Sequence, residues 1–204
     1  MRRWIVVPCT VLALAACTVP DPANSADDTT PLLLDETAPL HADAASATPY
    51  LRFDAGDGWT QTIADRSGLD QWQHEDGCLL TTGNLVDDEP TDAADDRTRT
   101  TEILDSAVEA LDQLGTLTAA DADPVMIPHD RHRSVEFAVR TVDYTLEGDG
   151  TSWRTWYASR AIVTDTLVLS VNLTCPAAVA AAAPDRFHDV ASDLTITDAD
   201  APSS

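Results

Sequence analysis

Alternation of apolar and polar residues is clearest between residues 135 and 175, where it predicts a meander of three antiparallel strands. Turn signals separate these strands at 148–150 (Gly-Asp-Gly) and at 164–166 (Thr-Asp-Thr). In the last strand, Leu167, Leu169 and Val171 alternate with Val168, Ser170 and Asn172. Such alternation is typical of an antiparallel strand that is buried on one face.

A helical period replaces the alternation between residues 97 and 115. The apolar residues recur at i, i+3, i+4 and i+7, which predicts an amphipathic helix that lays its stripe on a sheet or another helix. Gly115 stands where a glycine commonly ends a helix. The apolar stripe consists of Ile103, Leu104, Ala107, Val108, Leu111 and Leu114, and Glu102, Asp105, Glu109 and Asp112 are expected to face outward.

Shorter elements flank the helix and the meander. Residues 51–53 and 59–61 are predicted strands on either side of a turn at Asp57-Gly58, and 77–85 form another strand. After the meander, Pro176 opens an Ala-rich helix that Pro184 interrupts, and 194–197 form a closing strand. This order predicts one α+β domain, an antiparallel sheet with a three-strand meander covered by two helices.

The order of elements from Arg97 to Thr197 is similar to the Mog1/PsbP-like fold, and especially to the LpqN-type lipoproteins of actinobacteria. The resemblance rests on that order, on the strand "TLVLSVNLT" and on the ending "DVASDLTIT". It implies a binding or assembly accessory without catalysis, and it offers no catalytic residue to carry over.

The first sixteen residues have the pattern of a secretory signal peptide. Arg2 and Arg3 precede an apolar run that is shorter than the roughly 20 residues needed to cross a bilayer. The stretch Leu14-Ala15-Ala16-Cys17 resembles the lipobox of bacterial lipoproteins, which implies an acylated Cys17 after cleavage just before it. We therefore expect a lipid anchor on the extracytoplasmic face of the cell membrane, the alternative being that Cys17 is a buried thiol.

Composition then sets the expected domain boundaries. Residues 17–46 are rich in Pro, Ala, Ser, Thr and Asp and contain no Lys or Arg, which predicts a disordered acidic tether. Its apolar cluster, Leu32-Leu33-Leu34, is interpreted as incidental. The globular domain is expected over 47–197 and a disordered tail over 198–204.

The chain is strongly acidic. Its formal net charge is −23 at pH 7, and removing residues 1–16 takes away two arginines and leaves −25. The sequence contains no lysine. A field of this sign repels phosphate backbones and anionic headgroups, so we expect no nucleic-acid partner. We also expect a monomer.

Two cysteines remain in the expected domain, Cys78 and Cys175. An exported chain with two spare cysteines commonly pairs them. Chain-entropy arguments give such a long loop a stabilisation of about 4–5 kcal/mol. We predict a disulfide, with two free thiols as the alternative.

Candidate catalytic and metal chemistry is sparse. His129 and His132 are three residues apart and could contribute to a zinc site, but two arginines flank the segment and a solvated loop is the simpler interpretation. The motifs G-x-S-x-G and S-x-x-K are absent from the sequence. We expect no cofactor and no catalytic residue.

Aromatic and basic residues crowd the middle strand of the predicted meander. Trp153 and Tyr157 should share one face of it, and Trp156 and Arg154 the other. Together with Arg160 they form the candidate binding face, because Trp, Tyr and Arg are favoured at recognition sites. The alternative is that each Trp is in the core or covered by a helix.

The sequence thus predicts a membrane-anchored, non-catalytic binding or accessory module for an envelope protein. A carrier or sensor of a small apolar ligand or lipid is the second hypothesis. A metal-dependent enzyme that uses His129 and His132 is the third.

Overall fold

A computed structural model describes most of the predicted domain. The predicted signal peptide, Cys17 and most of the predicted tether lie outside the described residues, as do residues 199–204. The described residues are 30–37, 40, 49–64, 68–86, 93, 95–113, 115–129, 134–148 and 150–198.

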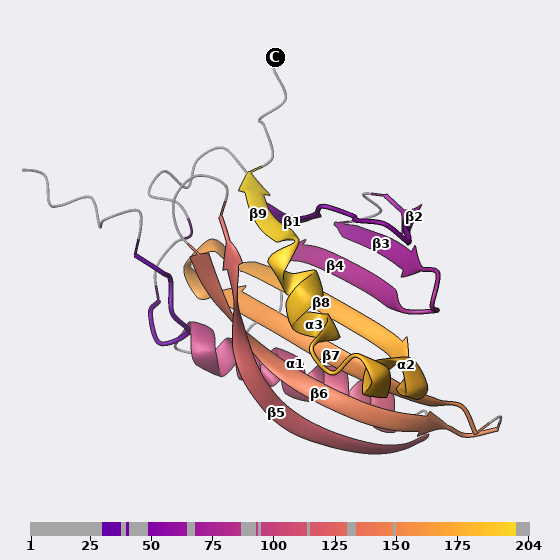
Figure 1. Ribbon diagram of the computed structural model, residues 1–204. Coiled ribbons are helices and arrows are strands. Elements are labelled where there is room, and N and C mark those ends of the chain that lie inside the picture. The colour runs from indigo at the N-terminus through magenta and orange to yellow at the C-terminus, as the bar shows by residue number, and fades with distance from the viewer. Residues whose placement is uncertain are drawn as a thin grey trace, which may run out of the picture.

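The centre of the molecule is a seven-stranded antiparallel sheet with the strand order β2-β3-β4-β8-β7-β6-β5 (Figure 1). A separate antiparallel pair, β1 with β9, lies over one face of this sheet. The strands are β1 (Pro49–Phe53), β2 (Trp59–Ile63), β3 (Leu69–His74), β4 (Leu79–Val86), β5 (Gly115–Pro128), β6 (Ser134–Leu146), β7 (Ser152–Ile162), β8 (Leu167–Pro176) and β9 (Leu194–Asp198). The helices are α1 (Asp96–Asp112), α2 (Ala177–Ala182) and α3 (Arg186–Ser192).

The α+β class and the three-strand meander, β6 to β8, are confirmed, but the sheet is larger than predicted. Strands β3 and β5 are not among the predicted elements, and β5 extends the meander to four strands. Gly115 does not end the helix, because α1 ends at Asp112 and Gly115 is the first residue of β5. A Cβ atom on Gly115 would lie 2.0 Å from the carbonyl oxygen of Thr145, so this close approach of two strands requires a glycine.

Helices cover both faces of the sheet. Helix α1 packs mainly on β7, and Asp95 caps its N-terminus by accepting a 2.7 Å hydrogen bond from the Thr98 N–H. Leu104 of the predicted apolar stripe is buried, whereas the four acidic residues predicted to face outward are exposed. We call this side of the sheet the α1 face.

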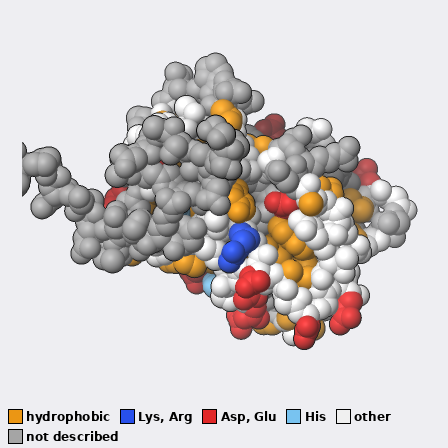
Figure 2. Space-filling view, turned by 90° about the horizontal axis from the view of Figure 1, so that it is seen from above, with side chains coloured by type: hydrophobic (Ala, Val, Ile, Leu, Met, Phe, Trp, Pro, Cys, Tyr) orange, Lys and Arg blue, Asp and Glu red, His pale blue; other side chains and the backbone are white. Residues whose placement is uncertain are grey.

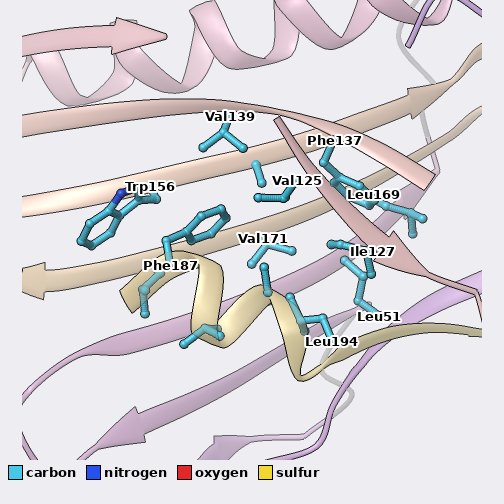
Figure 3. Close-up of a cluster of buried hydrophobic side chains, with 14 of the residues drawn as sticks. Leu51, Val125, Ile127, Phe137, Val139, Trp156, Leu169, Val171, Phe187 and Leu194 are labelled. Carbon is cyan, nitrogen blue, oxygen red and sulfur yellow. The ribbon is translucent and has the colours of Figure 1, made fainter. Parts of the chain in front are cut away.

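The other side, the α2–α3 face, carries the main hydrophobic core. Pro184 interrupts the predicted Ala-rich helix, and two short helices, α2 and α3, result. Phe187 and Val190 of α3 are buried, as the sequence predicts. Figure 3 shows side chains from β1, β5, β7, α3 and β9 meeting in this core, although these elements are far apart in the sequence.

The N-terminal strap, residues 31–36, belongs to the domain, which corrects the predicted tether over 17–46. The Leu32 N–H donates to the Ser134 carbonyl and the Glu136 N–H donates to the Leu32 carbonyl, both at 2.9 Å. Leu32 and Leu34 are buried, so the leucine cluster is not incidental. The pairing of β6 with β7 ends at Ala138, and the strap supplies partners to the main chain of β6 beyond that point.

The predicted disulfide is confirmed. Cys78 and Cys175 are joined at an S–S distance of 2.07 Å, and both side chains are fully buried. The bond links the residue before β4 to the end of β8. Within the described part of the chain, no helix has the length and apolar character needed to cross a bilayer.

Candidate functional site

The five residues of the predicted binding face do not form one exposed surface. Trp156 lies on the α2–α3 face, is 6% exposed and stacks on Phe187, with ring centroids 6.2 Å apart and planes 8° apart. Of the two alternatives for this tryptophan, burial under a helix is therefore correct, because α3 lies over it.

Arg160 is fully buried, which also corrects its predicted place on a binding face. Its Nη2 donates to Asp96 Oδ2 at 2.8 Å and to the Glu36 carbonyl at 3.0 Å. Burial lowers the pKa of Arg160 and, despite hydrogen bonds from the Val163 N–H and Arg160, raises the pKa of Asp96. Arg160 thus joins β7, α1 and the N-terminal strap, and its role is structural.

The first turns of α1 also satisfy main-chain groups at the end of β7. The Ala161 N–H donates to Thr100 Oγ1, and the Val163 N–H donates to Asp96 Oδ1, both at 2.9 Å. Strand β6 no longer pairs with β7 at these positions. Asp96 and Thr100 are therefore buried polar residues with defined partners, as buried polar groups generally require.

Arg154 is the basic residue of the predicted face that remains partly exposed. It makes a two-pronged pair with Asp143, with Nε–Oδ1 and Nη2–Oδ2 distances of 2.7 Å each. This pair raises the pKa of Arg154, and the guanidinium lies 5.8 Å from the centre of the Trp156 ring. Arg154 therefore forms part of a surface but already has an anionic partner.

Trp153 and Tyr157 lie on the α1 face, as strand alternation predicts. Both are half-buried. Burial raises the pKa of the Tyr157 hydroxyl, with a smaller contribution from Tyr144. The indole Nε1 of Trp153 is buried and has no acceptor among the described residues.

Two shallow hollows lie along the outer strands β5 and β6 on the α2–α3 face, and we call them together the trough and take them as the candidate functional site. One part has a volume of about 430 Å³ and is bounded by α2, and the other has about 560 Å³ and is bounded by α3. Arg154 lines the first part and Trp156 the second. The other lining residues include Thr116, Thr118, Asp143, Thr145, Ala177 and Ala181 in the first, and Ala122, Val139, Pro184, Phe187 and His188 in the second.

The chemistry of the trough suits binding by shape and hydrogen bonding. Its floor carries hydroxyl and methyl groups from Thr116, Thr118 and Ala122, and its arginine is paired with Asp143. Within the described ranges, no three or more His, Cys, Asp or Glu side chains gather closely enough to hold a metal ion. The trough therefore offers a contact surface of small side chains, with the largely buried rings of Trp156 and Phe187 and the carboxylates of Asp121, Asp123 and Asp185 in its second part.

The outer edge of the trough is β5, which sequence reasoning missed. Its residues 119–121, Ala-Ala-Asp, and Pro124 weaken the strand pattern. Thr116, Leu117 and Thr118 do follow the exposed and half-buried alternation of a strand, and this short run is the signal that could have located it.

One of the two histidines of the predicted zinc site, His129, is among the described residues. His132 lies outside the described residues. His129 is 9% exposed at the end of β5, where it forms a parallel β-bridge with Ile196.

A second polar cluster lies beside the disulfide. His74 Nδ1 lies 2.8 Å from Asp76 Oδ1, and Arg186 Nη2 lies 2.8 Å from Asp76 Oδ2. Partial burial opposes ionisation of Asp76, but the Cys78 N–H, His74 and Arg186 together lower its pKa. Cys78 is held in the disulfide, so this cluster has no thiol nucleophile and ties α3 to the β3–β4 turn.

Acidic side chains lie on the described surface that faces the viewer in Figure 2. They flank hydrophobic patches there, and little basic surface is in view.

No family model matches this chain, and no curated protein matches it. Among solved structures it is similar to LpqN, described as involved in cell envelope biogenesis of Mycobacterium tuberculosis, with a TM-score of 0.47, 14% identity, and coverage of 74% of this chain and 85% of that one. It is also similar to PsbP from Synechocystis sp. PCC 6803, with a TM-score of 0.43, 14% identity, and coverage of 74% and 92%. The comparison of structures thus finds the same two proteins, LpqN and PsbP, that the sequence resembles.

Proposed function

We propose that the protein is an exported lipoprotein, anchored through Cys17, whose domain is a non-catalytic binding module for an envelope protein. The observation that carries the proposal is the open trough beside the edge strand β5. Small neutral side chains line much of its floor, and its charged pair, Arg154 with Asp143, is already satisfied. Such a surface can accommodate a protein segment, which supports the proposal of a binding module.

Export is supported by two independent features. The lipobox stretch that ends at Cys17 predicts lipidation, and a buried disulfide is typical of proteins that fold outside the reducing cytosol. The acidic surface fits a domain that stays off the anionic surface of its own membrane.

The N-terminal strap limits how far such a domain can reach. Because the strap is packed into the domain, the predicted tether shortens to the fourteen residues 17–30. Fourteen residues span at most about 50 Å when fully extended. In this proposal the strap therefore lies within that distance of the membrane, and the partner lies within reach of a domain held there.

A carrier of a small apolar ligand is the second candidate, and one observation favours it. The part of the trough under α3 has a volume of about 560 Å³ and is lined in part by Trp156, Phe187 and Val139. This volume is within the range of small-molecule sites, roughly 300–1,000 Å³.

Cell fractionation of the Cys17→Ser variant tests the anchor. We expect the variant to leave the membrane fraction or to remain unprocessed, whereas the matched Cys9→Ser variant stays at the membrane. Retention of Cys17→Ser like the wild type would contradict the anchor. Native mass spectrometry of the exported protein separates the two functions, because a co-purified lipid or metabolite would favour the carrier.

A further inference from the structure

The outer side of β5 carries main-chain groups that no described strand pairs with. The Leu146 N–H donates to the Thr151 carbonyl across the β6–β7 turn, so the main-chain groups of Leu146 point toward β7. Gly115 of β5 lies opposite Leu146, and its main-chain groups therefore point outward, away from β6. Orientation alternates along a strand, so Leu117, Ala119 and Asp121 also turn their N–H and C=O groups outward. Figure 1 shows β5 at the open edge of the sheet.

The free edge has defined ends. The register of β5 against β6 is continuous from Gly115 to Ala122 and shifts between Ala122 and Val125. Beyond that point Pro124 and Pro128 lack an N–H, and the His129–Ile196 bridge brings β9 against the end of the strand. An added strand therefore has about eight residues of β5 to pair with, which is long enough for a stable ladder.

The acidic surroundings of the β5 edge favour a partner segment with basic side chains. Exposed carboxylates lie on both sides of it, and Arg140 is shared between two of them, Asp105 and Asp121. Arg154 is engaged by Asp143. Asp123 of β5 and Asp185 before α3 are exposed and lie along the same hollow as Asp121, and Glu109 and Asp112 are exposed residues of α1, a helix that contacts β5.

The same charge argues against two other occupants. A second copy of this chain would bring together two domains from a protein with a formal net charge of −23. The predicted tether, residues 17–46, contains no Lys or Arg. An extended segment with basic side chains fits the edge better than either.

We propose that the edge of β5 from Gly115 to Ala122 binds an extended segment of the envelope partner that carries Lys or Arg at alternate positions. The segment adds an eighth strand to the sheet through the outward groups of Leu117, Ala119 and Asp121. Its side chains on one face lie along the trough and those on the other face lie near α1. This inference rests on the proposed function and names the site and the partner chemistry.

Photo-crosslinking in intact cells tests the proposal on the full-length protein. A benzophenone amino acid replaces Thr118, on the trough side of β5, or Thr60, on the opposite edge strand β2. Each crosslinker position is combined with one of two substitutions at Ala119. Ala119→Pro removes an outward N–H and leaves the hydrogen bonds between β5 and β6 in place, whereas the control, Ala119→Thr, keeps that N–H. The thermal midpoint of each variant checks that the domain is folded.

We expect an adduct at Thr118 whose yield falls about tenfold with Ala119→Pro and is unchanged with Ala119→Thr. Mass spectrometry of the adduct should identify a segment containing Lys or Arg. If Ala119→Pro does not fold, a second pair of variants tests the charge of the site instead. Asp112→Asn with Asp123→Asn should lower the yield several-fold, whereas Asp54→Asn with Asp57→Asn, an equal charge change at a distant loop, should not.

The contrary outcomes separate the two proposals. An adduct at Thr60 alone, or one at Thr118 that persists in folded Ala119→Pro, would overturn the β5 site and leave the binding function standing. An adduct with an acidic segment or with another copy of this chain would overturn the partner chemistry. No adduct at either edge would count against both proposals.

Discussion

The guanidinium of Arg160 lies 2.8 Å from the carboxylate of Asp96, and both side chains are fully buried. Arg160 comes from the end of β7 and Asp96 from the first turn of α1, and Arg160 also donates to the N-terminal strap at Glu36. Three segments distant in sequence are therefore joined at one charged pair. A buried pair of this kind is costly to break because the remaining charge has no solvent.

Removing one member of this pair should destabilise the domain strongly. We expect Arg160→Met to lower the free energy of unfolding by about 3–5 kcal/mol, because Asp96 stays buried without its cation. The matched variant Arg154→Met removes a partly exposed pair and should cost about 1 kcal/mol or less. Urea unfolding followed by tryptophan fluorescence gives both values, and equal effects would contradict the structural role of Arg160.

The pH dependence of Arg160→Met gives a second readout. Burial raises the pKa of Asp96 in the folded state, and loss of Arg160 removes an influence that lowers it. A carboxyl with a folded-state pKa above its unfolded value is stabilising when protonated, so the variant should recover part of its loss as pH falls toward that folded pKa. No recovery relative to the wild type between neutral and mildly acidic pH would contradict this assignment.

The N-terminal strap should contribute to stability through Leu32. This side chain is 1% exposed, whereas Leu33 beside it is 45% exposed. We expect Leu32→Ala to cost about 2–4 kcal/mol and Leu33→Ala less than about 0.5 kcal/mol. Chemical denaturation of the exported protein measures both, and a neutral Leu32→Ala would mean that the strap does not belong to the core.

Asp76 should make the domain sensitive to acid. Its pKa is lowered from the ordinary value of 3.8, so its contribution to stability is present above pH 4 and is lost as pH falls through the lower folded-state value. Thermal midpoints measured from pH 6 down to pH 2 should fall less steeply in Asp76→Asn than in the wild type. Asp57→Asn, in an exposed loop, is the control and should follow the wild type.

The disulfide between Cys78 and Cys175 closes a separation of 97 residues. Reduction, or the Cys78→Ala/Cys175→Ala variant, should cost about 2–5 kcal/mol and lower the thermal midpoint by about 5–15 °C. Circular dichroism with and without reductant measures the shift. An unchanged midpoint in fully reduced protein would contradict a stabilising role for the bond.

The sequence predicted the elements whose local pattern is strong. The apolar stripe located α1, the alternation from Leu167 located β8, and Pro184 marked the interruption between α2 and α3. The disulfide was predicted because two cysteines in an exported domain commonly pair. These features depend on periodicity or on residue chemistry that acts locally.

The missed features depend on tertiary contacts. Strand β5 contains Ala119-Ala120-Asp121, a weak strand pattern that pairing with β6 overrides. Leu32 is buried because β6 extends beyond the end of its pairing with β7, and the strap lies beside this unpaired part of β6. The sequence does not reveal where that pairing ends. The strand pattern alone allows Trp156 and Arg160 to lie on a surface. Their burial depends on Phe187 of α3 and on Asp96, which come from distant parts of the sequence.

Intact-mass spectrometry of the protein extracted from its own membranes is the sharpest test of whether it is a lipid-anchored exported module. We expect a chain that begins at Cys17, carries the added mass of a diacylglyceryl group, and is lighter by two hydrogens because Cys78 and Cys175 are bonded. A mass corresponding to an uncleaved chain or to an unmodified Cys17 would contradict the anchor and with it the proposed function.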